Sequence, residues 1–312
     1  MNHQPERKLV PPFTPWLTRC TLLWIALLTS SGVWAEGVLI LHPEIRGPYA
    51  RIYIDTVAGI QQSYRGASNI VPVLPAHPLN ADLLGEPGPN VAVALGNSVT
   101  RALIPLNPQI PVITTGTIDA PFPIRRQLAY YPDPPMLLEQ LRRFQPGVER
   151  INLVASSEIS NYVGRVSEVL AAAGVSLEVC PAESLREAAE CYRRLMDQAA
   201  SGEALWILQG GRLLEPALLS FILDVAWKRR LPIFSSNPDH AGRGALFALF
   251  PDNEAAGRQI GRLIEECLRD CGNESFRISY LQEMKVVLNA RTSRHLGLDI
   301  SPEIRQDVDL VL

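Results

Sequence analysis

From residue 37 onward, short continuous apolar runs alternate with segments of helical periodicity. The apolar runs lie at residues 38–41, 70–74, 91–95, 111–114, 151–154, 176–180, 204–208, 232–234, 244–250 and 285–288. Continuous rather than alternating runs predict parallel strands that are buried on both faces. Helical spacing between the runs predicts helices at residues 51–64, 98–106, 135–144, 159–173, 182–200, 216–229 and 253–271.

The proline-rich segment at residues 130–135 interrupts this alternation and divides it into two successive series. Two such series predict an α/β protein with two Rossmann-like lobes, each a parallel sheet covered by helices. Ligands of such sheets bind beyond the carboxyl ends of the strands. A hinge in the segments that cross between the lobes would let the lobes close on a ligand.

The first 35 residues have the order of a secretory signal peptide. Arg7, Lys8 and Arg19 precede an apolar run at residues 21–28, and small residues follow up to Ala35. We therefore expect cleavage after Ala35 and a periplasmic or otherwise exported protein. The alternative is an uncleaved membrane anchor, although the apolar stretch is shorter than the ~20 residues that a membrane span needs.

The net charge of the chain restricts the classes of binding partner that we expect. Without residues 1–35 the chain has 26 basic and 31 acidic residues, a net charge of −5. An acidic exported protein is a poor candidate for nucleic acid or for an anionic membrane surface. We therefore expect no nucleic-acid partner, and contact with a membrane only through a partner protein or an uncleaved signal.

Four cysteines lie beyond residue 35, and an even number in an exported chain permits disulfides. Cys180 and Cys191 lie on neighbouring predicted elements and could meet. Cys267 and Cys271 are four residues apart near a helix end, a spacing that rarely gives good bridge geometry inside a regular helix. The pairing stays open, because all four could instead be small buried apolar residues.

The sequence contains no recognisable catalytic motif. Glycine-rich dinucleotide and phosphate loops, paired metal-binding histidines and nucleophile-elbow motifs are all missing. His42, at the end of the first predicted strand, is the only histidine near the expected ligand edge. It would indicate an enzyme only if a carboxylate and a serine lay within hydrogen-bond reach. We expect no enzymatic activity, no cofactor and no metal.

Small polar residues follow strand after strand, and this repetition predicts a site for a small polar ligand. Ser98 can cap the helix that starts near residue 97, whose first N–H groups would attract an anion such as a carboxylate. Tyr49 could stack on a planar ligand or pack beneath its loop. The candidate ligand-binding residues are Tyr49, Asn97, Ser98, Thr115, Gly116, Asp119, Ser156, Ser157, Gln209 and Asn237.

Five short stretches carry a family resemblance: residues 286–298 (VVLNARTSRHLGL), 301–304 (SPEI), 243–246 (RGAL), 257–259 (GRQ) and 146–151 (PGVERI). They resemble stretches of the substrate-binding proteins of ABC transporters, in the subgroup related to aromatic amino-acid binding proteins. The resemblance implies the type I periplasmic-binding-protein fold. It implies an N-terminal lobe of residues 37–128 plus 250–278, and a C-terminal lobe of residues 129–249 plus 279–312.

Two positions depart from the family pattern. Asp119 falls where the family has an aspartate–proline pair, but Ala120 follows it here. Residues 209–211 read Gln-Gly-Gly where many relatives have threonine-aspartate-asparagine. If that aspartate holds a ligand's ammonium group in the relatives, this chain is not expected to bind ordinary amino acids.

Together these observations predict an exported solute-binding protein that captures a small polar metabolite in an interlobe cleft for an ABC-type importer. The resemblance implies a permease and an ATPase as partners. The alternatives are a periplasmic sensory or accessory ligand-binding subunit that acts on a membrane sensor without a transporter, and an exported α/β enzyme. The identity of the ligand does not follow from the sequence.

Overall fold

A computed structural model describes residues 37–47, 49–74, 77–85, 88–116, 124–208, 213–271, 275–298 and 300–312. The predicted signal peptide lies outside these ranges. Within them, no helix is both long enough and apolar enough to cross a membrane.

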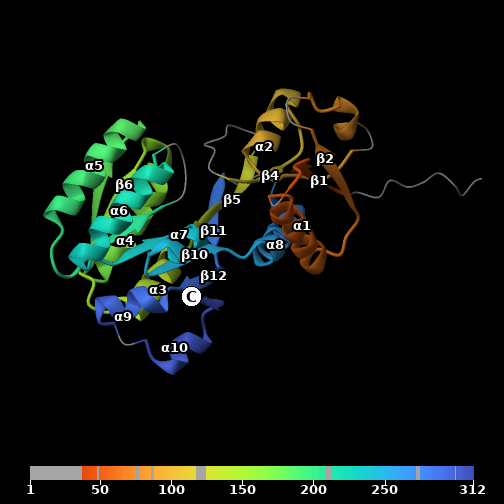
Figure 1. Cartoon of the computed structure of the whole chain (residues 1–312). Coiled ribbons are helices and arrows are strands. Elements are labelled where there is room, and N and C mark those ends of the chain that lie inside the picture. The colour runs from red at the N-terminus through yellow and green to blue at the C-terminus, as the bar shows by residue number, and fades with distance from the viewer. Residues whose placement is uncertain are drawn as a thin grey trace, which may run out of the picture. The chain divides into compact units, whose positions relative to one another are not determined.

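The first sheet has the spatial order β11–β5–β4–β3–β1–β2, and all of its described pairs are parallel (Figure 1). Its strands are β1 (Val38–Pro43), β2 (Ser68–Val73), β3 (Val91–Ala94), β4 (Val112–Thr115), β5 (Ile124–Pro132) and β11 (Arg277–Leu281). Alternate residues of β1 enter two different cores. Val38 and Ile40 pack with α8 (Asn253–Asp270), whereas Leu39 and Leu41 pack with α2 (Asn97–Leu103). Burial on both faces explains why the strands are continuous apolar runs.

The second sheet has the order β13–β12–β10–β9–β8–β6–β7. Its strands are β6 (Arg150–Ala155), β7 (Ser176–Pro181), β8 (Glu203–Ile207), β9 (Ile233–Ser235), β10 (Phe247–Pro251), β12 (Met284–Leu288) and β13 (Leu310–Val311). One core joins the sheet to α3 and α4, and another joins it to α5 and α6. Both faces of this sheet are therefore covered as well.

The helices are assigned to the sheets by these cores and by direct contacts. Those of the first sheet are α1 (Ala50–Ser63), α2 (Asn97–Leu103) and α8 (Asn253–Asp270), with short 3-10 turns at Ala81–Leu84 and Ile104–Leu106. Those that follow or cover the second are α3 (Pro134–Phe144), α4 (Ser160–Ala172), α5 (Leu185–Gln198), α6 (Pro216–Arg229), α7 (Pro238–Arg243), α9 (Ala290–Leu296) and α10 (Pro302–Gln306), with a 3-10 turn at Ser157–Ile159.

The described chain passes between the two sheets three times. It leaves the first sheet after β5, returns to it between β10 and α8, and leaves it again between β11 and β12. The described fold is therefore α/β with two Rossmann-like halves, as the sequence predicts. The division of the lobes at residues 128/129, 249/250 and 278/279 stays a prediction.

Three details differ from the sequence-based expectations. Residues 130–132 do not interrupt the strand pattern, because they are the end of β5. The first half of this strand contains polar residues, so β5 is not a continuous apolar run. Two of these polar residues, Arg126 and Gln127, are nevertheless buried. In the second sheet, β12 runs antiparallel to β10, because the chain enters β12 directly from β11 without a crossover helix.

The third difference concerns the cysteines. Cys267 and Cys271 form a disulfide, as do Cys180 and Cys191. The expectation that Cys267 and Cys271 have poor geometry for a disulfide is wrong, because α8 ends at Asp270. Cys271 therefore lies just past the regular helix, and its Cα is 4.3 Å from that of Cys267.

Candidate ligand-binding site

The turn between β3 and α2 is held against the end of β4. Gly96 adopts φ +87°, a left-handed conformation that favours glycine. Its N–H donates a 2.8 Å hydrogen bond to Oγ1 of Thr115, the last residue of β4, and its carbonyl accepts one from Thr100 Oγ1. Thr115 is only 5% exposed, so its hydroxyl satisfies a backbone group and fixes the carboxyl edge of the sheet.

Asn97 presents an unpaired acceptor at this edge. Its Oδ1 is buried, and among the described residues it has no hydrogen-bond partner. The atom lies against Gly116, where φ is +116° and a Cβ would overlap it. Gln127 holds Gly116 from the other side, with Nε2 donating to the Gly116 carbonyl at 2.6 Å. A buried acceptor without a donor is costly, so this point of the edge suits a hydrogen-bond donor from a ligand.

The aromatic rings of Tyr53 and His42 lie at the same edge of the sheet. The Tyr53 hydroxyl lies next to Gly96, at 3.1 Å from where a Cβ would be. The His42 ring stacks on that of Tyr53, with centroids 6.5 Å apart. Burial raises the pKa of Tyr53, so the hydroxyl stays a neutral donor. His42 Nδ1 lies 3.1 Å from the carbonyl of Pro43, and no described serine or carboxylate bonds to this ring, so it forms no nucleophile–base pair.

At the carboxyl edge of the second sheet, Ser235 organises the loop after β9. Its Oγ lies 3.1 Å from the Ile207 carbonyl and 2.8 Å from His240 Nδ1, and it accepts the Asn237 N–H at 3.1 Å. A hydroxyl has one proton, so donation to Ile207 requires His240 to donate from Nδ1. Burial, aided by Arg243, lowers the pKa of His240, which favours this neutral ring. Ser235 is 1% exposed, and its hydroxyl bonds to backbone groups of Ile207 and Asn237. The Ser235–His240 pair therefore has a structural role.

The loop after β6 is tied to the segment after β7. Ser157 begins the 3-10 turn at Ser157–Ile159, and its N–H donates to Glu183 Oε1 at 2.7 Å. This bond lowers the pKa of the Glu183 carboxyl and keeps it ionised. Ser156 is half-buried just before the turn.

The predicted residues therefore have different outcomes. The structure brings Asn97, Thr115 and Gly116 together. Ser98 does not cap α2, because Gly96 takes that position and Ser98 is the exposed second residue of the helix. Tyr49 precedes α1 and is 68% exposed.

Asn237 caps α7, its Oδ1 accepting the Asp239 N–H. Asp119 and Gln209 lie outside the described residues.

Sequence reasoning missed Tyr53, Gln127 and His240 as members of these edges. A polar residue inside a strand was the available signal for Gln127. The contacts of Tyr53 and His240 depend on tertiary packing and leave no local pattern. Among the described residues, no group of histidine, cysteine, aspartate and glutamate side chains is arranged to hold a metal ion.

The cavities found among the described residues are not lined by the predicted ligand-binding residues. A pocket of about 380 Å³ between α6, α7 and α9 is lined by Trp227, Arg243 and Arg291 among others. The Arg291 guanidinium lies 5.2 Å from the centre of the Trp227 ring, which also stacks on His295. None of the predicted ligand-binding residues lines this pocket.

Comparison with protein families identifies the chain. Residues 137–311, more than half of the sequence, match the family described as ABC transporter substrate binding protein. The chain belongs to this family. It is a solute-binding protein by family, and the predicted resemblance is confirmed. No curated protein sequence matches the chain.

Solved structures of similar fold agree. A ligand-free, open substrate-binding protein with adhesive properties from Clostridium difficile has 12% identity and a TM-score of 0.61, covering 89% of this chain and 99% of its own. An ABC domain in complex with L-Trp from Streptococcus pneumoniae has 15% identity and a TM-score of 0.56, covering 88% and 99%. A conserved domain protein from Vibrio cholerae has 13% identity and a TM-score of 0.56, covering 89% and 100%. Identities this low show the fold alone, that of the two-lobed periplasmic binding proteins.

Proposed function

We propose that this substrate-binding protein is exported after cleavage at Ala35 and captures a small polar metabolite for an ABC-type importer. The ligand binds between the carboxyl edges of the two sheets, and the three passages between the sheets act as the hinge. Binding favours the closed state, which a permease with its ATPase recognises. The partners follow from family membership.

The observation that carries the site is Asn97 Oδ1, which is buried without a hydrogen-bond partner among the described residues. Around it, the described edge offers Thr115 and Gly116, with Tyr53 beside Gly96. Neutral hydrogen-bonding groups beside an aromatic ring suit a small polar ligand that donates hydrogen bonds, with an apolar or planar part. Ser156, Ser157 and Asn237 of the second edge, and Tyr49, Ser98, Asp119 and Gln209, complete the proposed ligand contacts.

The test is a thermal-shift screen of residues 36–312 against amino acids, purines, sugars and small organic acids. A ligand that binds only the native state must raise Tm. For a compound that does so, Asn97→Ala is expected to weaken binding about five- to thirtyfold, the cost of one lost buried hydrogen bond of roughly 1–2 kcal/mol.

Asn69→Ala is the matched control, since Asn69 lies exposed on edge strand β2 and should leave affinity unchanged. Equal affinity of wild type and Asn97→Ala would disprove the site. Absence of any ligand across the screen would count against the capture function itself.

A further inference from the structure

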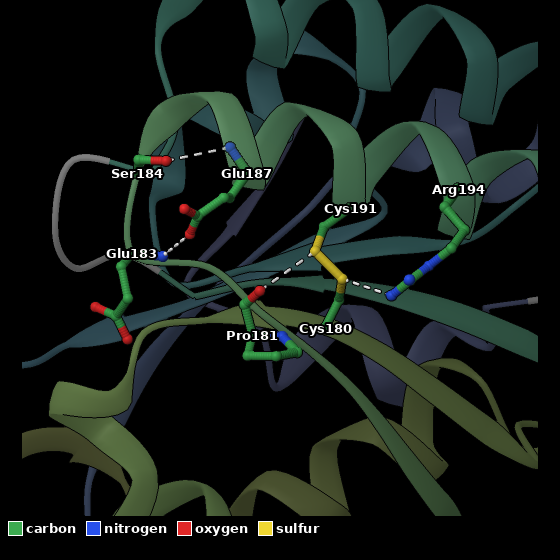
Figure 2. The surroundings of a disulfide bond; sticks show 7 residues. All are labelled: Cys180, Pro181, Glu183, Ser184, Glu187, Cys191 and Arg194. Atoms are coloured by element: carbon green, nitrogen blue, oxygen red, sulfur yellow. Dashed lines mark hydrogen bonds between the residues drawn. A yellow bond between two sulfur atoms is a disulfide. The ribbon is translucent and has the colours of Figure 1, made fainter.

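The Cys180–Cys191 disulfide has an arginine and an open pocket beside it. Cys180 lies near the end of β7, the edge strand of the second sheet, and Cys191 lies in the second turn of α5 (Figure 2). Their Cα atoms are 5.8 Å apart, and the bridge closes a loop that contains Glu183 and Ser184. The bond therefore joins the sheet edge to the helix that covers it.

The guanidinium of Arg194 contacts one of the two sulfurs of this disulfide. Nη2 of Arg194 lies 2.7 Å from Cys180 Sγ, and Figure 2 shows the arginine reaching from α5 toward that sulfur. Among the described residues, no carboxylate forms an ion pair with Arg194. Cys191 Sγ has a different neighbour, the Pro181 carbonyl oxygen at 3.6 Å. The two sulfurs are therefore electrostatically unequal: one faces a cation, the other a carbonyl dipole.

Both cysteines also line an open pocket of about 650 Å³. The charged groups around it are Glu187, Glu190, Arg193, Arg194 and Asp197, all on α5. Cys191 is 8% exposed and Cys180 is 2% exposed, so the residue whose sulfur lacks the arginine contact is the more exposed of the two. Cys191 therefore lies in the wall of a pocket that is open to solvent.

The second disulfide provides an internal contrast. Cys267 and Cys271 are 4% and 2% exposed and belong to the apolar core between α8 and the first sheet, just as Cys180 and Cys191 belong to the apolar core that joins the second sheet to α5 and α6. No described cationic side chain contacts either sulfur. The arginine contact and the open pocket therefore distinguish Cys180–Cys191 from this second pair, whose surroundings disfavour a thiolate.

We propose that Cys180–Cys191 is a thiol–disulfide exchange site for small-molecule thiols. The incoming thiolate attacks Cys191 Sγ and forms a mixed disulfide there. The Cys180–Cys191 bond breaks, and its electron pair leaves on Cys180 Sγ as a thiolate that the Arg194 guanidinium stabilises. A second thiol then attacks the mixed disulfide, which releases Cys191 as a thiol and the small molecule as its own disulfide.

Cys180 is expected to be the leaving group in this exchange because Arg194 lies beside its sulfur. Thiol–disulfide exchange is faster when the departing thiol has a low pKa, and a neighbouring arginine lowers the pKa of a cysteine. Opening this bond would also remove one of the restraints on the segment that carries Glu183, whose carboxylate accepts the Ser157 N–H at the carboxyl edge of the same sheet. Exchange at one edge is thereby linked to the order of a loop near the strand ends.

Reduced glutathione is the probe. The folded, oxidised chain is incubated with it at neutral pH, quenched with iodoacetamide at intervals, and mapped by peptide mass spectrometry. We expect glutathione on Cys191, carbamidomethyl on Cys180, and at least tenfold slower modification of Cys267 and Cys271. Arg194→Gln should slow the first step about three- to tenfold through the poorer leaving group, and Arg194→Lys should recover part of the rate.

Arg193→Gln is the control, because it removes the same charge from the same helix and pocket. Its rate should match wild type within twofold, and circular dichroism should show all variants folded. Glutathione on Cys180 instead of Cys191, equal rates for Arg194→Gln and Arg193→Gln, or exchange only in denaturant would each overturn the proposal.

Discussion

Gly257 in α8 lies directly against the carbonyl oxygen of Thr56 in α1, and a Cβ at position 257 would overlap that oxygen. The same holds for Gly59 against the Glu254 carbonyl and for Gly261 against the Ser63 hydroxyl. These glycines let α1 and α8 lie side by side at backbone contact on the first sheet (Figure 1). The family-like stretch at residues 257–259 therefore has a packing role in this chain.

Gly257→Ala is predicted to destabilise the fold. The added methyl group meets backbone rather than a side chain that can move, and overpacking of this kind costs about 1–3 kcal/mol. Urea denaturation should show a lower midpoint with an unchanged slope. Gly164→Ala is the control, since Gly164 is exposed in α4 with nothing near a Cβ. It should be stabilising by up to ~1 kcal/mol, and equal effects of the two changes would contradict the argument.

Thr115→Val should destabilise the carboxyl edge of the first sheet. Valine keeps the shape but leaves the Gly96 N–H without its acceptor, a loss of about 1–3 kcal/mol. Thr100→Val is the matched change, because the Gly96 carbonyl keeps the Thr100 N–H when the hydroxyl is removed. Unfolding free energies from denaturant titration should therefore fall more for Thr115→Val. The reverse order would show that the Gly96 turn does not depend on this hydroxyl.

Stability should fall as the medium is acidified through the titration of His240. Its folded-state pKa lies below the ordinary value of about 6.5 because of burial, with Arg243 adding to the effect and Asp239 opposing it. The unfolded chain therefore binds the proton first, and this contribution to stability is present above pH ~6.5 and is lost as pH falls toward the folded pKa. His240→Gln should lose less Tm than wild type between pH 7 and pH 5. An equal loss would exclude His240 as the source.

Glu183→Gln is expected to loosen the loop that begins at Ser157. The lowered pKa of Glu183 means that its carboxylate accepts the Ser157 N–H at neutral pH. This contribution is present above the unfolded carboxyl pKa of about 4.3 and is lost as pH falls through the lower folded value. Amide hydrogen exchange at Ser157 should be faster in the variant. Glu190→Gln, an exposed change on α5, should leave it unaltered.

The family-like stretches at the carboxyl end also acquire physical reasons. Asn289 caps α9 through Oδ1 and the Thr292 N–H, and its Nδ2 donates to the Ala241 carbonyl at 2.7 Å. Gln259 donates to the Tyr280 carbonyl and so ties α8 to β11. These residues hold elements of the fold together, which is why they indicated the fold better than they indicated a ligand.

Most of the strands and the long helices follow from the sequence itself, because burial on both faces of a parallel sheet leaves continuous apolar runs such as residues 91–95. The strand β5 escaped this reading because Arg126 and Gln127 are polar yet buried, and only its neighbours β4 and β11 make it a strand. The closeness of Asn97 to Gly116, the contact of Arg194 with Cys180 and the burial of His240 were decided by tertiary structure. Each joins side chains or turns from separate elements, or depends on packing around them, and a local sequence pattern carries no information about such distances.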